Sequence, residues 1–399
     1  MAQRAHLKAG FRRALLAELR QIGARPGLMF MLAPFPLLLF ALLAAVFQLG
    51  LPRDLPIAVV DQDRSTLSRQ MVRIVDATPE VAVAHEASSL SEGRQLLLSG
   101  EAYAVVLIPA RTERDVLAGR RPEVVLFYNN QYMTPGSLVA RSVGGALGTV
   151  AAGISIEARV ARGADVESAT QAVTPVPVRQ SALFNPSLEY VQFLLAAVMP
   201  TVLQIFIGAS AALSFSRDRQ GVAGLGRSLR LGGTLMRTAT GKLAPYTLTY
   251  LLVLWGADAL LFGPMGARFG GNLAFHVAYG LVFVLASQML GAAAALIARD
   301  TVSALAAIGV ITGPAFGFTG ITFPRLSMNG FSTVWADLLP VTHYLELRTD
   351  NILRGASFDI SLPAFVSLAT LALAYGGVTL LLLWRHGRPR PAIAVEAGR

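Results

Sequence analysis

Long apolar runs separated by polar segments dominate the hydrophobic pattern of this chain. The first run, residues 27–50, is long enough at about 1.5 Å per residue to cross a hydrocarbon core of roughly 30 Å. It starts too late and runs too long for a cleaved signal peptide. Five more runs follow, at residues 190–213, 243–262, 273–298, 301–322 and 363–384. The pattern predicts an α-helical integral membrane protein with six transmembrane helices, and Pro34 and Pro36 predict a kink in the first.

The polar insert between the first two runs, residues 51–189, alternates strand and helix patterns. Four short runs have strand character, "PIAVVD", "EVAVAHEA", "AYAVVLIP" and "EVVLFYNN". Ser65 or Thr66 is placed to cap the first intervening helix. Ser89 and Glu92 form a capping box for the second, which ends at Gly100. The insert is therefore expected to be a small α/β domain.

Residues 142–156, near the end of the insert, carry no charge and raise the question of a seventh span. The run has only 15 residues and is bounded by Arg141 and Glu157. A run this short is more often a packed helix than a membrane span. We therefore expect a buried helix of the inserted domain.

The basic residues are concentrated in four segments, at residues 1–26, 214–242, 299–300 and 385–399. These segments hold 17 of the 34 Lys and Arg but only 4 of the 24 Asp and Glu. Cytoplasmic loops of membrane proteins carry such an excess, so both termini are predicted to be cytoplasmic and the insert extracytoplasmic. Membrane orientation thus accounts for the net charge of +10, and we expect no nucleic-acid partner.

Charge and hydropathy together give the expected domains. Residues 1–26 form a cytoplasmic amphipathic helix, with Leu15, Leu16 and Leu19 on one face along the membrane surface. The remaining parts follow in order: transmembrane helix 1 at 27–50, the extracytoplasmic α/β domain at 51–189, transmembrane helices 2–6 at 190–384 and a cytoplasmic tail at 385–399.

Catalytic and cofactor-binding patterns are not found in the sequence. The glycine-rich stretch "RDRQGVAGLGRSLRLGG" lies between two spans, and Gly241-Lys242 is followed by Leu243, so no phosphate-binding loop is formed. Asp61 and Asp63 lack the further ligands and the glycine of a calcium loop and fit turn chemistry better. We expect no catalytic residue, bound cofactor or metal in this chain.

Polar residues within the apolar runs are candidates for function, because such groups are costly in a membrane. Asp258 lies about five residues from the expected outer end of its run, so it either reaches interfacial water or acts within the membrane. Gln204, His276 and Gln288 are candidates for substrate contact or for hydrogen bonds between helices.

Glycines at four-residue spacing mark one face of the fifth run. Gly309, Gly313 and Gly317 permit a close helix approach, either within the chain or at a dimer interface or substrate path. Pro314 introduces a kink or hinge in this helix.

The order of one span, an external α/β domain and five spans resembles the permease subunit of an ABC-2 type exporter. The segments "LPIAVVDQDRSTLSRQMVRIV" and "GEAYAVVLIPARTERDVLAGRRPEVVLFYNN" are similar to that family's external domain. "GITFPRLSMN" and "ADLLPVTHYLELRTDNILRG" carry the most specific match, which implies an external re-entrant hairpin over residues 323–345. The matching residues are Phe323, Pro324, Met328, Leu339, Pro340, Thr342, Tyr344 and Arg348.

The resemblance also implies the partners. Permeases of this family pair with a second copy or a paralogue and bind cytoplasmic ATPase subunits, which hold the ATP and Mg, through the loop at residues 214–242. The implied coupling residues are Arg217, Asp218, Arg219, Gly221, Leu225, Arg227 and Arg230. Val222 stands where the family has Thr, and Gly224 and Gly226 are expected to weaken the coupling helix. The alternative is a merely solvated loop.

The function implied is export of an apolar or amphipathic substrate across a bacterial inner membrane, along a path between the second and fifth spans. A periplasmic adaptor is a further implied partner. The alternative is a non-transporting scaffold or secretion-associated protein with a partner-binding external domain. A sensor is disfavoured because the expected cytoplasmic segments are short.

Overall fold

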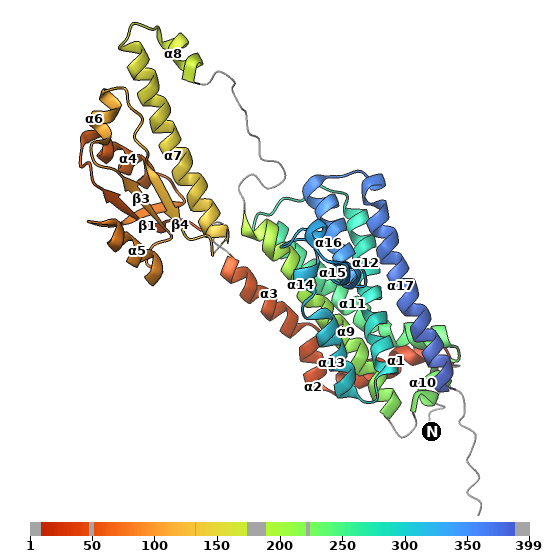
Figure 1. The fold of residues 1–399 in the computed structure, drawn as a ribbon. Coiled ribbons are helices and arrows are strands. Elements are labelled where there is room, and N and C mark those ends of the chain that lie inside the picture. The colour runs from red at the N-terminus through yellow and green to blue at the C-terminus, as the bar shows by residue number, and fades with distance from the viewer. Residues whose placement is uncertain (1–8, 48–51, 132, 174–188, 221–223, 388–399) are drawn as a thin grey trace, which may run out of the picture. The chain divides into compact units, whose positions relative to one another are not determined.

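The computed structural model forms two compact units, Met1–Gln48 with Leu183–Arg399, and Leu49–Ala182. It describes residues 9–47, 52–131, 133–173, 189–220 and 224–387. The first unit is helical and the second contains a sheet (Figure 1).

Long helices build the helical unit. In chain order its elements are α1 (Phe11–Gly23), α2 (Pro26–Leu32), α3 (Pro34–Phe47), the π-helix η1 (Val191–Leu195), α9 (Ala196–Gln220), α10 (Gly224–Gly232), α11 (Leu235–Phe262), α12 (Leu273–Ile297), α13 (Thr301–Thr312), α14 (Ala315–Phe318), the 3-10 helix η2 (Arg325–Ser327), α15 (Gly330–Asp337), α16 (Pro340–Arg348), the π-helix η3 (Thr349–Arg354) and α17 (Phe358–Gly387).

The apolar runs predicted as spans all fall in this unit. Across the described residues, seven helical stretches are long and apolar enough to cross a membrane, six here and Thr134–Val160 in the sheet unit. The first span is interrupted between α2 and α3 at Ala33, which confirms the kink before Pro34. The fifth is likewise broken between α13 and α14, at Gly313 and Pro314.

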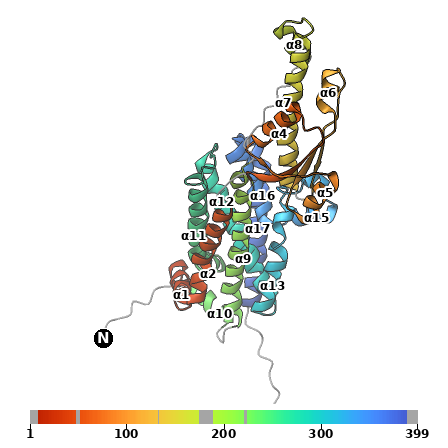
Figure 2. The ribbon, with the colours of Figure 1, turned by 90° about the vertical axis from the view of Figure 1, so that its left-hand side faces the viewer.

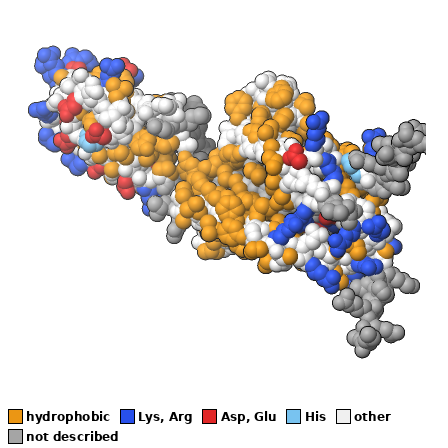
Figure 3. Space-filling view, turned by 90° about the horizontal axis from the view of Figure 1, so that it is seen from below, with side chains coloured by type: hydrophobic (Ala, Val, Ile, Leu, Met, Phe, Trp, Pro, Cys, Tyr) orange, Lys and Arg blue, Asp and Glu red, His pale blue; other side chains and the backbone are white. Residues whose placement is uncertain are grey.

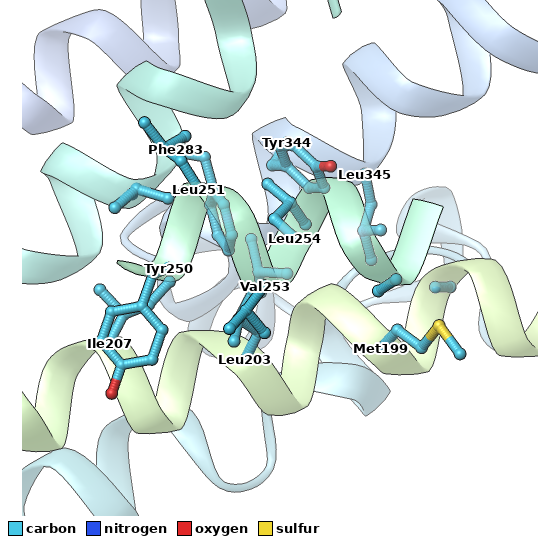
Figure 4. Close-up of a cluster of buried hydrophobic side chains, with 14 of the residues drawn as sticks. Met199, Leu203, Ile207, Tyr250, Leu251, Val253, Leu254, Phe283, Tyr344 and Leu345 are labelled. Carbon is cyan, nitrogen blue, oxygen red and sulfur yellow. The ribbon is translucent and has the colours of Figure 1, made fainter. Parts of the chain in front are cut away.

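Helices α9, α11 and α12 form the centre of the bundle. Tyr246 and Tyr250 of α11 and Tyr279 and Phe283 of α12 are fully buried among aliphatic side chains. Figure 4 shows Ile207 of α9 beside Tyr250 in this core. Burying large aromatic side chains at tight density makes this part of the bundle rigid.

A four-stranded sheet of order β2-β1-β3-β4 organises the second unit. β1 pairs in parallel with β2 and β3, and β4 is antiparallel to β3. The elements are β1 (Leu55–Asp61), α4 (Thr66–Asp76), β2 (Val81–Glu86), α5 (Leu90–Ser99), β3 (Ala104–Ile108), α6 (Thr112–Leu117), β4 (Val125–Tyr128), α7 (Met133–Val160) and α8 (Val166–Val173). The predicted α/β domain is confirmed in these elements.

The alternation of side chains along β1 supplies two cores. Ile57 and Val59 face the core formed with α4 and α7, whereas Ala58 and Val60 face the core on the α5 side. Val143 and Val150 of α7 belong to the first core. The uncharged run 142–156 therefore lies in a helix that packs on this sheet unit through Val143 and Val150. The expectation of a buried helix is wrong, because α7 is longer than predicted and the other residues of this run are partly or fully exposed.

Local capping in this unit largely follows the sequence. The Ser65 hydroxyl accepts the Ser68 N–H at 3.0 Å, and Gly100 ends α5 with a positive φ of 77°. The capping box needs one correction, because the Glu92 carboxylate accepts the N–H of Ser88, at 2.7 Å, and not that of Ser89.

Turn chemistry accounts for the two aspartates after β1. The Asp61 carboxylate accepts the N–H groups of Asp63 and Arg64, and Asp63 accepts the N–H of Glu113. Over the described residues, no group of three or more His, Cys, Asp or Glu is placed to hold a metal ion.

Candidate functional site

A buried set of charged side chains, here called the Glu18 cluster, joins four helices at one end of the bundle. It consists of Glu18 of α1, Arg217 and Asp218 of α9, and Lys242 of α11, with Ser228 of α10 at its edge. Lys242 Nζ lies 2.8 Å from both Glu18 Oε2 and Asp218 Oδ2. Arg217 pairs with Glu18, and the Ser228 hydroxyl donates to Asp218.

The Glu18 carboxylate has its remaining acceptor positions filled. The hydroxyls of Ser214 and Tyr246 donate to Oε1 at 2.9 and 2.7 Å. Burial alone would favour protonation, but Lys242 and Arg217 outweigh it and hold the pKa of Glu18 below its ordinary value. Two cations and two carboxylates therefore form a neutral, hydrogen-bonded group, the arrangement that makes buried charges tolerable.

Close backbone packing accompanies this cluster. A Cβ on Gly241 would lie 2.7 Å from the Ala14 Cβ and 2.9 Å from the Phe11 carbonyl oxygen, so only glycine lets α1 approach α11 here. Gly232, which ends α10, similarly touches Thr238 of α11. Helix α1 is thus fixed to α11 by both shape and charge, whereas α10 packs closely on α11 and bonds to Asp218 of α9 through Ser228. Figure 2 shows α1 and α10 at the same end of the bundle.

The predicted coupling residues prove to have different environments. Arg217 and Asp218 belong to the Glu18 cluster. Arg219 donates to the carbonyls of Ala295, Leu296 and Arg299, at the end of α12. Leu225 is buried, whereas Arg227 and Arg230 are exposed on α10. Gly221 and Val222 lie outside the described residues.

The stretch that the glycines were expected to weaken is helical in the structure. Residues Gly224–Gly232 form α10 despite the glycines at 224 and 226. Gly224 has a positive φ of 54° at the first position, where glycine is favoured, and Leu225 packs into the core between α9 and α11. Tertiary packing of an amphipathic face outweighs the poor intrinsic propensity.

A second group of buried charges, the Asp258 cluster, joins α11, α12 and α16 at the opposite end of α11. It consists of Asp258, His276 and Arg348, with the hydroxyls of Tyr279 and Tyr344 around them. His276 Nε2 lies 2.8 Å from Asp258 Oδ2, and Arg348 pairs with Oδ1. The Arg348 guanidinium also donates to Tyr344 and lies 5.5 Å from the Phe262 ring centroid.

The first interpretation of Asp258, that it reaches interfacial water, is wrong. Its exposed fraction is 8%, and both of its carboxylate oxygens are used within the cluster. The Arg348 guanidinium at the end of α16 compensates the buried charge, a pairing that spacing along the chain does not reveal.

The other polar candidates make hydrogen bonds between helices. Gln204 Oε1 accepts the Val341 N–H at 2.7 Å and so caps the start of α16. Gln288 Oε1 accepts the Thr247 hydroxyl at 2.8 Å. Both contacts support the hydrogen-bonding alternative for these residues.

The hairpin residues divide into an exposed and a buried group. Phe323 and Pro324 are exposed and Met328 is half-buried. The other five lie in the core around α16, namely Leu339, Pro340, Thr342, Tyr344 and Arg348. Pro340 occupies the first position of α16, where its missing N–H costs nothing.

The glycine face formed by Gly309 of α13, Gly313 at its C-cap and Gly317 of α14 is open with respect to the described part of the chain. A Cβ on Gly309 or Gly317 would meet nothing within 4 Å, and Gly313 would meet only the carbonyl oxygen of Gly309 in its own helix. Ala306 is exposed on the same face. Packing against a described helix of the same chain therefore does not account for these glycines.

Sequence reasoning missed Glu18 and Lys242, although each had a signal. Glu18 is the one acidic residue among the first 26, and Lys242 begins an apolar run in a chain with only one other lysine, Lys8. A single acidic residue in a basic segment predicts an ion pair with a basic side chain. A lysine at the start of a span likewise predicts an ion pair with an acidic one.

These features define a polytopic membrane protein whose long apolar helices are tied together by buried ion pairs. The chain matches the ABC-2 family of transporter proteins over residues 25–381 and belongs to that family. It is similar to the inner membrane transport permease YhhJ of Escherichia coli (strain K12), at 25% identity over 339 residues, covering 82% of this chain and 84% of that protein. The permease of the same name from Shigella flexneri matches equally.

Proposed function

We propose that this chain is the permease subunit of an ABC-2 type exporter in a bacterial inner membrane. Six helices of the helical unit cross the membrane, both termini are cytoplasmic, and α7 belongs to an extracytoplasmic domain. Family membership, the inner membrane relatives and the packing of α7 on the sheet support this arrangement. The family supports an ATPase partner as well, and no phosphate-binding loop occurs in this sequence.

The Glu18 cluster is the observation that carries the mechanism. It ties α1 and α9 to α11 through ion pairs at 2.8 Å between buried side chains, and α10 joins it through the Ser228 hydroxyl, which donates to Asp218. A cytoplasmic ATPase that binds ATP and Mg docks on the exposed side of α10, where Arg230 lies, and on α1. Because both helices are fixed to α11, their displacement moves the centre of the bundle as one body.

The substrate path lies at α9 and α13 and suits an apolar or amphipathic substrate, because charges inside the bundle are already paired. A second permease copy or paralogue packs on the open glycine face of α13, where small residues permit close contact. The extracytoplasmic domain guides substrate or binds a periplasmic adaptor. Its deletion, residues 52–173, is expected to reduce export while leaving ATPase association intact.

Purification from cells that coexpress the neighbouring ATPase tests the proposal. The ATPase is expected to copurify, and inside-out vesicles are expected to show ATP-dependent uptake of a hydrophobic dye. The Arg230→Glu variant should weaken copurification, whereas Arg268→Glu, an exposed arginine after α11, should not. Absence of both association and ATP-dependent flux would favour the non-transporting scaffold.

A further inference from the structure

A pocket of about 160 Å³ lies in the helical unit, and Arg348 of the Asp258 cluster forms part of its wall. The rest of the wall comes from η1, the start of α9, the end of α11 with the loop after it, the segment after α14, and α16 with η3. Most of the lining side chains are apolar, and they include the rings of Phe193 and Phe262. An apolar cavity of about 150 Å³ holds one benzene molecule, so this pocket has room for one ring-sized apolar group.

An unpartnered polar side chain lines the same pocket. Gln192 of η1 is 6% exposed, and its amide has no hydrogen-bond partner among the residues that the structure describes. Burying an amide without a partner costs stability, and such groups are uncommon in folded proteins. The hydroxyl of Thr349, which also lines the pocket, likewise has no partner in the described part of the chain. A ligand with a hydroxyl or carbonyl group supplies the partner that the fold does not.

The two polar residues lie in π-helical turns. Gln192 belongs to η1, and η3 contributes Thr349, Ile352 and Leu353 to the wall. π-helical turns are rare and are frequent at functional sites. Both of the π-helices among the described residues therefore border one pocket, which sets it apart from ordinary gaps in the bundle.

The charges around the pocket favour a neutral ligand. Arg348 is already paired with Asp258, and no carboxylate is among the described residues that line the wall. Arg268 also lines the pocket but is exposed, so water screens its charge. Figure 3 shows apolar side chains over broad areas of the helical unit, so apolar surface alone does not distinguish this site. The unpartnered Gln192 amide within an enclosed apolar wall does.

We propose that this pocket binds a small neutral aromatic molecule that carries one hydroxyl or carbonyl group. The ring packs against Phe193 and Phe262, because aromatic rings favour offset or edge contacts with one another. The hydroxyl or carbonyl group bonds to the Gln192 amide, which both donates and accepts hydrogen bonds. This inference goes beyond the proposed transport function, because the binding requires neither the ATPase nor flux.

Photolabelling of the full chain in detergent micelles tests the site. The probe is a benzyl alcohol that carries a photoreactive diazirine, and peptide mass spectrometry locates the labelled residues. Unlabelled benzyl alcohol, toluene, benzoate and cyclohexylmethanol compete with the probe at equal free concentrations. Relative to benzyl alcohol, toluene lacks the hydroxyl, benzoate adds a negative charge and cyclohexylmethanol lacks the aromatic ring.

Two glutamine variants separate the pocket from the rest of the bundle. Gln192→Leu is the pocket variant, and Gln192→Met, which keeps the side-chain length, serves if it does not fold. Gln288→Leu is the matched control, because Gln288 is a fully buried glutamine of the same unit that does not line the pocket. Gln192→Leu removes an unpartnered amide, so its midpoint of thermal unfolding should be unchanged or higher. A lower midpoint would show that the amide has a structural partner and would overturn the inference.

In wild type the label should map to residues 192–197, 261–268 or 345–353. Benzyl alcohol should compete about tenfold more strongly than toluene, because only the alcohol satisfies the buried amide. Gln192→Leu should remove this difference and Gln288→Leu should keep it. A difference that survives Gln192→Leu, or label confined to other segments, would overturn the site. Equal or stronger competition by benzoate or cyclohexylmethanol would overturn the class of ligand. Because no measurement involves the ATPase, failure here is separate from failure of the exporter proposal.

Discussion

The two buried charge clusters lie on the same helix, α11, and differ in what they fasten. Lys242 and Asp258 are 16 residues apart, which is about 24 Å along a helix. The Glu18 cluster holds two short helices, α1 and α10, to the bundle and borders an open groove. The Asp258 cluster holds α16 among aromatic rings. One end of α11 is thus attached to α1 and α10, where we propose that the ATPase docks, and the other end to α16.

This difference shows how one helix, α11, can connect the elements packed at its two ends. Charges at each end specify which neighbouring element is fixed, while the aromatic core between them resists bending. In this account α11 transmits displacement from α10 toward α16. Variants in the two clusters should therefore separate ATPase association from transport.

Removal of the Lys242 ammonium is expected to have the largest effect. Lys242→Met leaves Glu18 and Asp218 buried with one cation, so the free energy of unfolding should fall by about 5 kcal/mol and ATPase association should be lost. Chemical unfolding in mixed micelles measures the first and copurification the second. The matched control, D218N/K242M, removes one charge of each sign, leaves Glu18 paired with Arg217 and should recover part of the stability. No recovery would show that the charges are not compensating one another.

Arg348→Met should have the next largest effect, because it leaves Asp258 with only His276 as a partner. The expected loss is about 3 kcal/mol in the free energy of unfolding, with transport abolished. ATPase association should persist, since α1 and α10 are unaffected. Pull-down and vesicle flux on the same preparation test this separation. Loss of association in this variant would contradict the assignment of distinct roles to the two clusters.

The open glycine face gives a smaller, selective effect. A Cβ on Gly309 meets no neighbouring atom within the described chain, so Gly309→Ala should change monomer stability by about 1 kcal/mol or less, while dimer formation weakens. Gly291→Ala is the contrasting variant, because its Cβ would lie 2.1 Å from the Gly208 carbonyl oxygen. It should destabilise the fold itself. Light scattering and thermal unfolding distinguish the two outcomes.

Acidification is expected to have the smallest effect of the four, a gradual loosening of α1 from the bundle. The pKa of Glu18 lies below its ordinary value of 4.5, so its contribution to stability is complete above that pH and is lost as the pH falls through the lower, folded-state value. Hydrogen exchange in α1 should be constant near neutral pH and rise only below about 4.5. In Glu18→Gln this rise should disappear. A rise near pH 6 would implicate another group.

Much of the architecture follows from sequence because the signals are local. Apolar runs predict the long helices, period-two alternation predicts the strands, and Ser65 and Gly100 predict helix ends. The pairings across the bundle did not follow, since Glu18 and Lys242 are 224 positions apart. The family resemblance points to Arg348, but the sequence leaves Asp258 between interfacial water and a role within the membrane and does not identify the two as partners. Side-chain partners set by tertiary packing carry no short-range pattern.

The helix at residues 224–232 also shows that local sequence patterns do not reveal the effect of tertiary packing. Glycine content predicted a weak helix, but Leu225 is buried and Ser228 bonds Asp218, so packing stabilises what propensity does not. Sequence rules based on local propensity succeed for elements whose conformation depends mainly on their own residues. They fail for elements such as α10, whose conformation depends on packing against neighbouring helices.

The most direct test asks whether α1 and α11 move as one body. The chain has no cysteine, so Leu16→Cys and Met236→Cys, both exposed, can be labelled selectively with nitroxides. Pulsed electron spin resonance on the ATPase complex should give one narrow distance distribution that is unchanged by ATP, and Lys242→Met should broaden it. A distribution that shifts or splits when ATP binds, in a complex that still transports, would contradict the account.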